Sequence, residues 1–337
     1  MNPRAATKQQ LDALLDRLAG TAALYAPARV RNWTEFRRVH SYREIDLTRV
    51  NTKQPAKAAL FPQTEPLLRF AGNSTDASTK PPTEQVWFGV RPCDAAGLAF
   101  LEKFFSGNSP ADPYVQARRS HTTVISLACN EPAATCFCLA VGGSPTGTRG
   151  TDLLVTDLDG RYLAEPVTGK GETLVKDLPE ASPADIATKR KLAEKAAAAI
   201  TLRIDTATLK KKLDRSFEHP TWETLCLPCV NCGACTFLCP TCHCFDVTDE
   251  TRRGQTARIR VWDSCQFCLY SRHASGHNPR VTPRSRYRNR VMDKFSYTVD
   301  MVGKVSCVGC GRCIIECPSA IDIRETVTAL VQALPEE

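Results

Sequence analysis

Apolar and polar residues recur along the chain with periods that predict both helices and strands. Four leucines follow one another at helical spacing: Leu11, Leu14, Leu15 and Leu18. Thr7 and Gln10, at the start of this segment, have the spacing of a capping box. Short apolar runs over residues 86–90 and 124–127 predict two buried strands, and residues 95–105 predict a helix directly after the first strand.

The middle and the end of the chain carry further signals. Residues 152–167 predict a β-hairpin that turns at Asp159-Gly160. Ser182 followed by Pro183 is typical of the N-cap and first position of a helix, which the following residues continue. Helices are also predicted over residues 206–217 and 322–334.

The composition is that of an ordinary globular protein of two or three domains, with 337 residues of which 42% are apolar and 24% charged. There is no run of about 18 apolar residues that would predict a membrane span, and the N-terminus lacks the apolar core of a secretory signal. We therefore expect a cytoplasmic protein. Its 17 cysteines, an odd number at short spacings, predict metal ligation rather than disulfides.

Residues 229–240 and 307–318 repeat the spacing C-x2-C-x2-C-x3-C-P of bacterial two-cluster ferredoxins. In that pattern three sulfurs converge on one cubane and the fourth ligates the other cluster. We therefore predict one [4Fe-4S] cluster on Cys229, Cys232, Cys235 and Cys317, and a second on Cys307, Cys310, Cys313 and Cys239. Gly233 and Gly311 suit the tight turn of each loop. Zinc, the alternative, has no use for a third and a fourth cysteine at these offsets.

Four cysteines of the N-terminal half follow the two predicted strands. Cys93 lies at the turn after strand 86–90, and three more follow strand 124–127: Cys129, Cys136 and Cys138. The carboxyl ends of parallel strands meet at one edge of a sheet, where α/β proteins place their sites. We therefore predict a third [4Fe-4S] cluster at this edge. The alternative is a set of buried thiols that bind no metal.

The segment between the ferredoxin motifs brings a further set of cysteines: Cys242, Cys244, Cys265 and Cys268. A C-x-C and a C-x2-C provide enough ligands for a fourth cluster or a tetrahedral zinc ion. Cys226 is a spare that could replace any one of them. The alternative is that these cysteines are small hydrophobic residues of the core.

Together these signals predict an α+β chain of two domains. Residues 1–220 would form an N-terminal α/β domain with one [4Fe-4S] site. Residues 221–337 would form a bacterial two-cluster ferredoxin-like domain. Because 67 residues separate Cys239 from Cys307, far more than in a plain ferredoxin, we predict a long insertion over residues 245–300.

A basic run and a formal charge of +8 suggest an anionic partner such as nucleic acid. The cations of the run are Arg272, Arg280, Arg284, Arg286, Arg288, Arg290 and Lys294. Each cluster with its four thiolates adds roughly −2, however, so four clusters would bring the total charge to about zero. We expect the arginines to offset the cluster charge, pair with carboxylates or dock a partner subunit, and we expect no nucleic-acid partner.

Substrate machinery is missing from the sequence. It has no G-x-G-x-x-G after a strand, no P-loop, and no Ser-His-Asp or Cys-His order. The histidines at positions 121, 243, 273 and 277 are expected to be packing or surface residues. Clusters without such machinery predict an electron conduit with no catalytic residue of its own.

Seven segments in a fixed order carry a resemblance to a known family: GVRPCDAAGLAFLEKFF, DPYVQARRS, CNEPAATCFC, CPTCHCFDV, WDSCQF, ASGHNPR and CVGCGRCIIECP. Together they resemble the iron–sulfur β subunit of cytosolic [NiFe] sulfhydrogenases, and equally the A subunit of anaerobic sulfite reductase, of the same four-iron dicluster family. The match runs from about residue 85 to 325. The cysteines that match the family, besides the ferredoxin motifs, are Cys93, Cys129, Cys136, Cys138, Cys242, Cys244 and Cys265, whereas Cys226 and Cys268 are less typical.

The resemblance implies an electron-transfer subunit of a multisubunit oxidoreductase complex. In such complexes a flavoprotein subunit with FAD exchanges electrons with NAD(P)H, and the β subunit carries them along its clusters to or from a catalytic subunit. We therefore expect a relay between a flavoprotein and a hydrogenase-type subunit, or alternatively the same relay in an anaerobic sulfite reductase. Two other hypotheses stay open: an iron–sulfur nucleic-acid-binding protein, and a stand-alone reductase that binds substrate at an incompletely ligated cluster.

Overall fold

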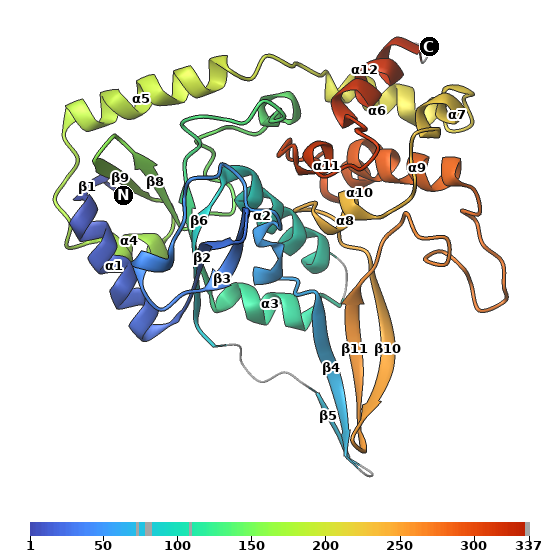
Figure 1. Cartoon of the computed structure of the whole chain (residues 1–337), viewed down its shortest axis with the longest axis horizontal. Coiled ribbons are helices and arrows are strands. Elements are labelled where there is room, and N and C mark those ends of the chain that lie inside the picture. The colour runs from blue at the N-terminus through green and yellow to red at the C-terminus, as the bar shows by residue number, and fades with distance from the viewer. Residues whose placement is uncertain (72–73, 78–82, 108–109, 334–337) are drawn as a thin grey trace. The chain divides into compact units, whose positions relative to one another are not determined.

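The computed structural model describes residues 1–71, 74–77, 83–107 and 110–333. Helices and strands both contribute, which confirms the α+β class (Figure 1). By its contacts the chain divides into two compact units. Unit 1 comprises Met1–Leu60, Pro81–Arg203 and Val308–Gly311, and unit 2 comprises Phe61–Lys80, Ile204–Cys307 and Arg312–Glu337. Both units draw on distant parts of the sequence, which the predicted division at residue 220 does not anticipate.

Unit 1 is built on a mixed sheet with the strand order β1-β9-β8-β7-β6-β2-β3. Its central strands are parallel: β2 Ala23–Val30, β6 Gln85–Val90, β7 Thr122–Leu127 and β8 Leu153–Asp157. Antiparallel strands complete its edges: β1 Arg4–Thr7, β3 Trp33–Arg38 and β9 Arg161–Pro166. The two predicted strands and the predicted hairpin are confirmed, and β6 and β7 are parallel neighbours as expected.

Helices accompany this sheet: α1 Lys8–Thr21, α2 Pro92–Ser106, α3 Pro113–Ser120, α4 Gly169–Val175 and α5 Pro183–Ala198. Short 3₁₀ turns lie at Tyr42–Glu44, Ala56–Ala59 and Cys138–Val141. Both predicted helix starts are confirmed. Thr7 and Gln10 form a reciprocal capping box, as do Ser182 and Asp185, with Pro183 in the first turn. These helices therefore begin where capping side chains accept hydrogen bonds from the free backbone N–H groups of the first turn.

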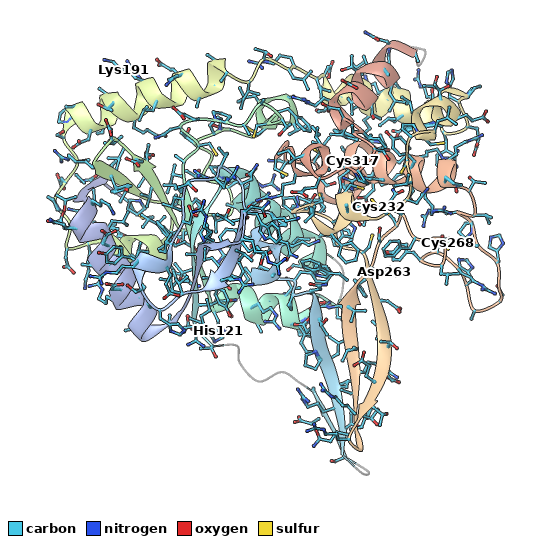
Figure 2. All side chains as sticks on the ribbon, in the orientation of Figure 1. His121, Lys191, Cys232, Asp263, Cys268 and Cys317 are labelled. Carbon is cyan, nitrogen blue, oxygen red and sulfur yellow. The ribbon has the colours of Figure 1, made fainter. Side chains whose placement is uncertain are left out.

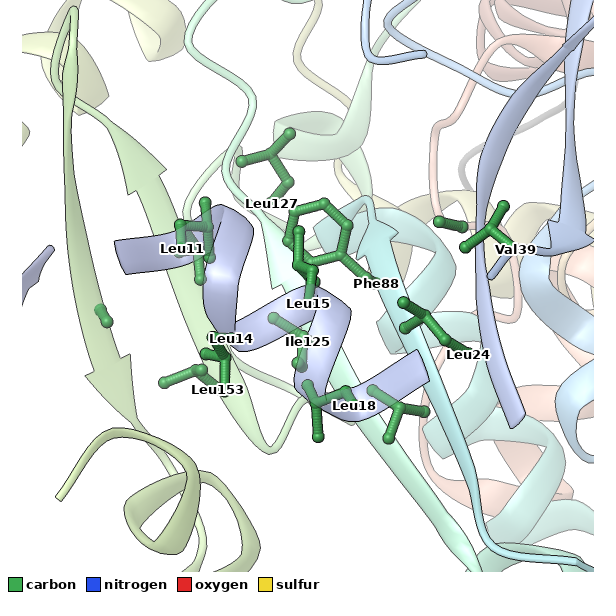
Figure 3. Close-up of a cluster of buried hydrophobic side chains, with 14 of the residues drawn as sticks. Leu11, Leu14, Leu15, Leu18, Leu24, Val39, Phe88, Ile125, Leu127 and Leu153 are labelled. Atoms are coloured by element: carbon green, nitrogen blue, oxygen red, sulfur yellow. The ribbon is translucent and has the colours of Figure 1, made fainter. Parts of the chain in front are cut away.

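The core of unit 1 lies between α1 and the sheet. The leucines of α1 are buried on one face and belong to one cluster with Leu24, Phe88 and Ile125 of the strands (Figure 3). Burying a leucine side chain fully is worth about 1.5–3 kcal/mol. The amphipathic spacing of α1 therefore accounts for the packing of the helix on the sheet.

Removal of the α1 cap is expected to destabilise unit 1 modestly. Thr7 accepts a hydrogen bond from the backbone N–H of Gln10 through its hydroxyl, and Thr7→Ala removes this acceptor. We expect a loss of about 1 kcal/mol in the free energy of unfolding, measured by denaturant titration. Thr7→Asp keeps an acceptor and is the matched control. Equal losses for both variants would contradict the capping role.

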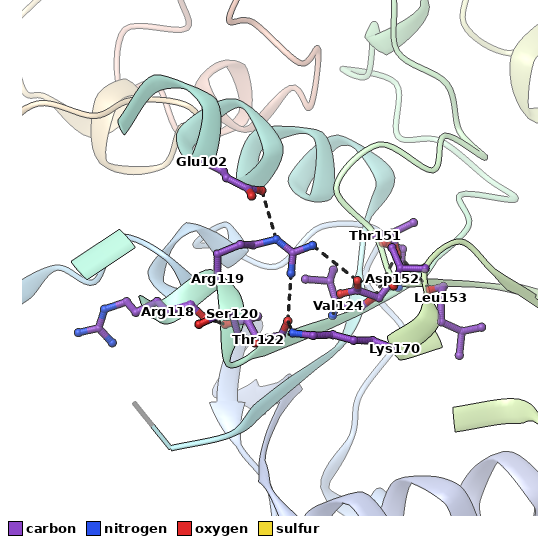
Figure 4. Close-up of polar contacts among 12 residues, drawn as sticks. Glu102, Arg118, Arg119, Ser120, Thr122, Val124, Thr151, Asp152, Leu153 and Lys170 are labelled. Carbon is purple, nitrogen blue, oxygen red and sulfur yellow. Dashed lines mark hydrogen bonds and ion pairs between the residues drawn. The ribbon is translucent and has the colours of Figure 1, made fainter. Parts of the chain in front are cut away.

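A polar network at the amino end of β7 ties three elements together (Figure 4). Asp152 is 1% exposed and accepts hydrogen bonds from Val124 N at 2.8 Å and from Thr168 at 2.7 Å. Arg119 forms ion pairs with Asp152 and with Glu102 of α2. Because the predicted cysteine site follows the opposite, carboxyl ends of the strands, this network stabilises the sheet away from the chemistry.

Unit 2 contains an antiparallel sheet with the strand order β10-β11-β4-β5. Its strands are β4 Thr64–Ala71, β5 Ser74–Ala77, β10 Phe245–Arg252 and β11 Gln255–Trp262. The insertion thus begins with a hairpin, and both turn residues, Arg253 and Gly254, have positive φ. Glu65 of β4 forms a buried ion pair with Arg260 of β11. Strands far apart in the sequence are thereby joined, which the sequence did not predict.

The helices of unit 2 carry the ferredoxin motifs. They are α6 Thr206–Arg215, α7 Thr221–Cys226, α8 Ala234–Phe237, α9 Pro283–Met292, α10 Thr298–Val302, α11 Arg312–Ile315 and α12 Ile323–Ala333. A π-helical turn, Asp293–Tyr297, follows α9 directly. The predicted helices at 206–217 and 322–334 are confirmed within one or two residues, and residue 334 lies outside the described residues.

Candidate iron–sulfur centres

A cavity of about 50 Å³ in unit 2 gathers the four cysteines predicted for the first cluster. Cys229 and Cys232 come from the loop before α8, and Cys235 lies in α8 itself. Cys317 follows α11 in the second motif; Figure 2 labels it together with Cys232. Cys313 also lines this cavity. The structure therefore brings together three sulfurs of one motif and the last sulfur of the other, the exchange that the spacing predicts.

Left-handed backbone at two positions turns this loop. Asn231 has a φ of 53° and Gly233 a φ of 76°. A Cβ on Gly233 would come within 2.8 Å of the Phe267 ring and 3.1 Å of the Ser264 hydroxyl oxygen. Only glycine combines this φ with this close approach. The tight turn lets the cysteines on both sides of Gly233 line the same cavity.

The rest of the cavity wall is largely apolar. Tyr287, Val291, Ile321 and Ile323 contribute to it. The backbone N–H of Ile321 donates a hydrogen bond to the sulfur of Cys317 at 3.3 Å. Backbone hydrogen bonds to cluster sulfurs raise the reduction potential of a cluster, and an apolar wall limits access of water. The wall therefore suits a redox centre more than a hydrolytic one.

Two thiols of this cavity, Cys229 and Cys235, are harder to ionise than exposed thiols. Burial raises the pKa values of both Cys229 and Cys235. Desolvation disfavours the thiolate, so these protons leave readily only when a metal takes their place. Metal binding and proton release are therefore coupled at this site.

Arg290 tests whether an anionic cluster fits the cavity. Its side chain lines the cavity and the residue is 7% exposed. Among the described residues it forms no ion pair with a carboxylate, and its electrostatic partners are cysteine sulfurs. A buried cation without a countercharge is costly. Four thiolates around a cubane, with a net charge of about −2, provide that countercharge, so the donor set fits a [4Fe-4S] cluster.

The second ferredoxin motif is divided between the compact units. Cys307 and Cys313 belong to unit 2, and Cys310 belongs to unit 1. Cys239, predicted to complete this set, lies in unit 2 with its sulfur 3.3 Å from the hydroxyl oxygen of Thr241. The assignment of a second cluster to these four cysteines stays a prediction.

A second cavity, of about 20 Å³ in unit 1, gathers the four N-terminal cysteines. Its lining includes Cys93, Cys129, Cys136 and Cys138. Cys93 lies in the first turn of α2, directly after β6, and Cys129 follows β7. Burial, together with the neighbouring Cys129 and Cys136, raises the pKa of Cys138 to about 12. These cysteines meet at the carboxyl edge of the parallel strands, as the sequence predicts.

Arg91 fixes the two strand ends against each other. It is the N-cap residue of α2, and its guanidinium donates to the carbonyl oxygens of Val50 at 2.6 Å and Ala128 at 3.0 Å. It also hydrogen-bonds the thiol of Cys129, although burial still raises the pKa of that thiol. One side chain thus holds the turn that carries Cys93 and the loop that carries Cys129.

Cys310, from the second ferredoxin motif, also lines this N-terminal cavity. Its carbonyl oxygen accepts a hydrogen bond from Asn51 at 2.9 Å and lies 4.0 Å from the sulfur of Cys136. The backbone N–H of Phe137 donates to the carbonyl oxygen of Gly309 at 2.8 Å. The sequence reasoning missed these contacts, because nothing in the spacing relates residues 136–138 to residues 309–310.

The cysteines of the insertion are only partly brought together. Cys244 hydrogen-bonds both Cys265 and Tyr270, and Cys242 hydrogen-bonds Cys239. Cys268 is exposed. Cys226, the spare, donates to the carbonyl oxygen of Glu223 at 3.3 Å. The structure thus gives three of these cysteines neighbouring sulfurs and leaves the metal content of this set a prediction.

His243, between two of these cysteines, is partly buried. One ring nitrogen lies 3.1 Å from the carbonyl oxygen of Thr241, and the other lies 3.9 Å from Asp293. Burial lowers its pKa, and Asp293 opposes that shift. These contacts are those of a packing residue.

Most cations of the basic run point into unit 2. Arg286, Arg288, Arg290 and Lys294 are buried, whereas Arg272 is exposed. Arg288 forms an ion pair with Glu218 at 2.9 Å and its guanidinium stacks 3.5 Å from the Phe217 ring centre. A surface that binds nucleic acid presents its arginines to solvent. The arrangement therefore favours the structural interpretation of the run.

Two further observations concern the described residues only. None of the helices described has the length and apolar character needed to cross a bilayer. In the same residues, no three His, Cys, Asp or Glu side chains are grouped as the ligands of a single metal ion.

Comparisons with known proteins agree with the cysteine pattern. A family described as a 4Fe-4S dicluster domain matches residues 228–321, which include both ferredoxin motifs. Sulfhydrogenase 2 subunit beta of Pyrococcus furiosus is 30% identical over 312 residues, which span 91% of this chain and 92% of that protein. No solved structure matches the chain. With this identity over nearly the whole of both proteins, the chain belongs to the family of sulfhydrogenase beta subunits.

Proposed function

We propose that this chain is the electron-transfer subunit of a hydrogenase-type oxidoreductase complex. It relays electrons between a flavoprotein that exchanges them with NAD(P)H and a catalytic subunit. The observation that carries the proposal is the cavity in which Cys229, Cys232 and Cys235 meet Cys317 from the other motif. Membership of the sulfhydrogenase beta family supports the choice of complex.

The residues of the chain hold and tune the centres. When bound, a [4Fe-4S] cluster accepts and donates one electron at a time. The cysteines fix its position, the Ile321 N–H stabilises the charge on the Cys317 sulfur, and the apolar wall excludes water. Since we assign no catalytic residue, substrate chemistry belongs to a partner.

We propose a third cluster on Cys93, Cys129, Cys136 and Cys138. Their shared cavity and its position at the carboxyl edge of β6 and β7 support this assignment. Cys310 lines the same cavity, so the N-terminal site adjoins a ligand that we assign to the second ferredoxin cluster.

A fourth centre remains a proposal about Cys242, Cys244 and Cys265. These cysteines would supply three ligands, with Cys268 or Cys226 as the fourth. A centre with three cysteines leaves one position for another ligand. Metal analysis of a Cys244→Ser variant distinguishes a cluster, a zinc ion and metal-free thiols by the iron or zinc that is lost.

The first experiment is anaerobic purification of the chain from its source, with mass spectrometry of the proteins that come with it. We expect a flavoprotein and a nickel-containing pair of subunits, and about four irons per predicted cluster. Sirohaem protein in place of the nickel-containing pair would assign the relay to a sulfite reductase instead. A chain that purifies without iron, or with nucleic acid alone, would overturn the proposal.

A further inference from the structure

Three buried cations follow one face of α9 and the π-helical turn at intervals of four residues. Arg286, Arg290 and Lys294 are 6%, 7% and 2% exposed. Residues four apart on a helix lie above one another on the same face. This face, which we call the inner cation stripe, runs beside the cysteine motifs of unit 2.

The other arginines of α9 have ordinary ion-pair partners. Arg284 pairs with Glu223 at 2.8 Å and also with Glu218. Arg288 shares Glu218 and stacks on Phe217. Because carboxylates offset their charge, these two residues join α9 to α7 and the segment before it. Arginines on one face of α9 therefore pair with carboxylates, whereas those on the other face belong to the inner cation stripe.

Within the inner cation stripe the partners differ from one residue to the next. Arg286 donates to neutral oxygens, the side chain of Asn231 at 3.3 Å and the carbonyl of Val281 at 2.7 Å. Lys294 pairs with the neighbouring Asp293 at 3.2 Å. Arg290 donates to the sulfur of Cys242 at 3.5 Å and lines the first cavity together with Cys235 and Cys313. Lys294 also interacts electrostatically with Cys242 and Cys239, but Arg290 is the cation of the stripe that both hydrogen-bonds a cysteine sulfur and lines the first cavity.

These sulfurs belong to more than one predicted centre. Cys235 is a predicted ligand of the first ferredoxin cluster, and Cys313 and Cys239 are predicted ligands of the second. The guanidinium interacts electrostatically with all three. Reduction adds one negative charge to a cluster. In a low-dielectric interior, a nearby fixed positive charge stabilises the reduced form more than the oxidised form.

We infer that Arg290 is a positioning residue that raises the reduction potentials of both ferredoxin clusters at once. This inference rests on the proposed clusters, but not on the identity of the partner subunits. A single buried charge shared by two centres moves both potentials in the same direction. It therefore keeps the centres within reach of one electron carrier while leaving the step between them nearly unchanged.

The test is a redox titration, followed by electron paramagnetic resonance, of the full chain purified anaerobically with its clusters. In Arg290→Gln we expect both ferredoxin-type signals to move to lower potential. The expected shift is about tenfold in the equilibrium constant for one-electron reduction, or about 59 mV. Arg290→Lys keeps the charge and should restore most of the shift. Arg284→Gln removes a carboxylate-paired charge from the same helix and should move neither signal measurably.

The outcomes separate this inference from the proposed function. Unchanged potentials in Arg290→Gln with full iron content, or a shift of one signal only, would overturn it. Loss of iron in both Arg290→Gln and Arg290→Lys, with Arg284→Gln intact, would also overturn it, since shape rather than charge would then matter. Loss of iron in Arg290→Gln but not in Arg290→Lys would support the inference, because the clusters would then require the positive charge. Absence of iron from the unaltered chain would instead refute the proposed function.

Discussion

Replacement of Cys317 by serine is expected to remove about four irons per chain, the content of one cubane, while the other centres stay loaded. Cys317 lies 88 residues after Cys229 in the sequence, yet the two line one cavity. A hydroxyl is a poorer ligand for iron than a thiolate. The loss should therefore fall on the cluster of the first motif, even though the substitution is in the second.

Iron and acid-labile sulfide per chain measure this effect. Cys268→Ser is the matched control, because Cys268 is exposed and outside both cavities. It should leave the iron and sulfide content unchanged unless the insertion holds a cluster of its own. Retention of all iron in Cys317→Ser would contradict the exchange of ligands between the motifs.

Substitution of Gly309 by alanine is expected to disrupt the N-terminal cavity. Gly309 has a φ of 65°, and an added Cβ would lie 2.5 Å from the backbone nitrogen of Cys138 and 2.5 Å from the carbonyl carbon of Phe137. Left-handed backbone costs alanine about 1–2 kcal/mol. Overpacking adds about 1–3 kcal/mol. The backbone of residues 137–138 cannot give way without moving Cys138, a cysteine of the proposed third centre.

Gly303→Ala separates these two costs. Gly303 has a φ of 78°, but an added Cβ would meet no atom within 4 Å. It should therefore lose only the 1–2 kcal/mol of backbone strain and keep its full iron content. Thermal unfolding under anaerobic conditions, with iron analysis, compares the variants. Equal effects of the two substitutions would show that the contact between residues 309 and 137–138 is unimportant.

Local signals in the sequence were sufficient for most of unit 1. Capping residues located the starts of α1 and α5, and apolar runs located β6 and β7. Because β6 and β7 are parallel, their carboxyl ends lie at the same edge of the sheet, and this correctly predicted that Cys93 lies near Cys129. Spacing alone grouped Cys229 with Cys317, since the ferredoxin pattern specifies which sulfurs converge.

Contacts between distant segments could not be predicted in the same way. The pairing of β4 with β11 depends on a buried pair, Glu65 and Arg260, whose residue types occur throughout the sequence. In the sequence, the close approach of Gly309 to Phe137 is marked only by two glycines, Gly309 and Gly311. The sequence did contain a signal for the inward face of α9. Its arginines occur at every second position, so Arg286 and Arg290 share one face of the helix, and Arg284 and Arg288 share another.

The assignment of Val308–Gly311 to unit 1 has a consequence for biosynthesis. Cys138 leaves the ribosome 173 residues before Gly311, a delay on the order of ten seconds or more at roughly 5–20 residues per second. During that time the N-terminal thiols lack one wall of their cavity. Iron loading of the proposed third centre would therefore have to await synthesis of residues 309–311, so a chain terminated before them would not retain that centre.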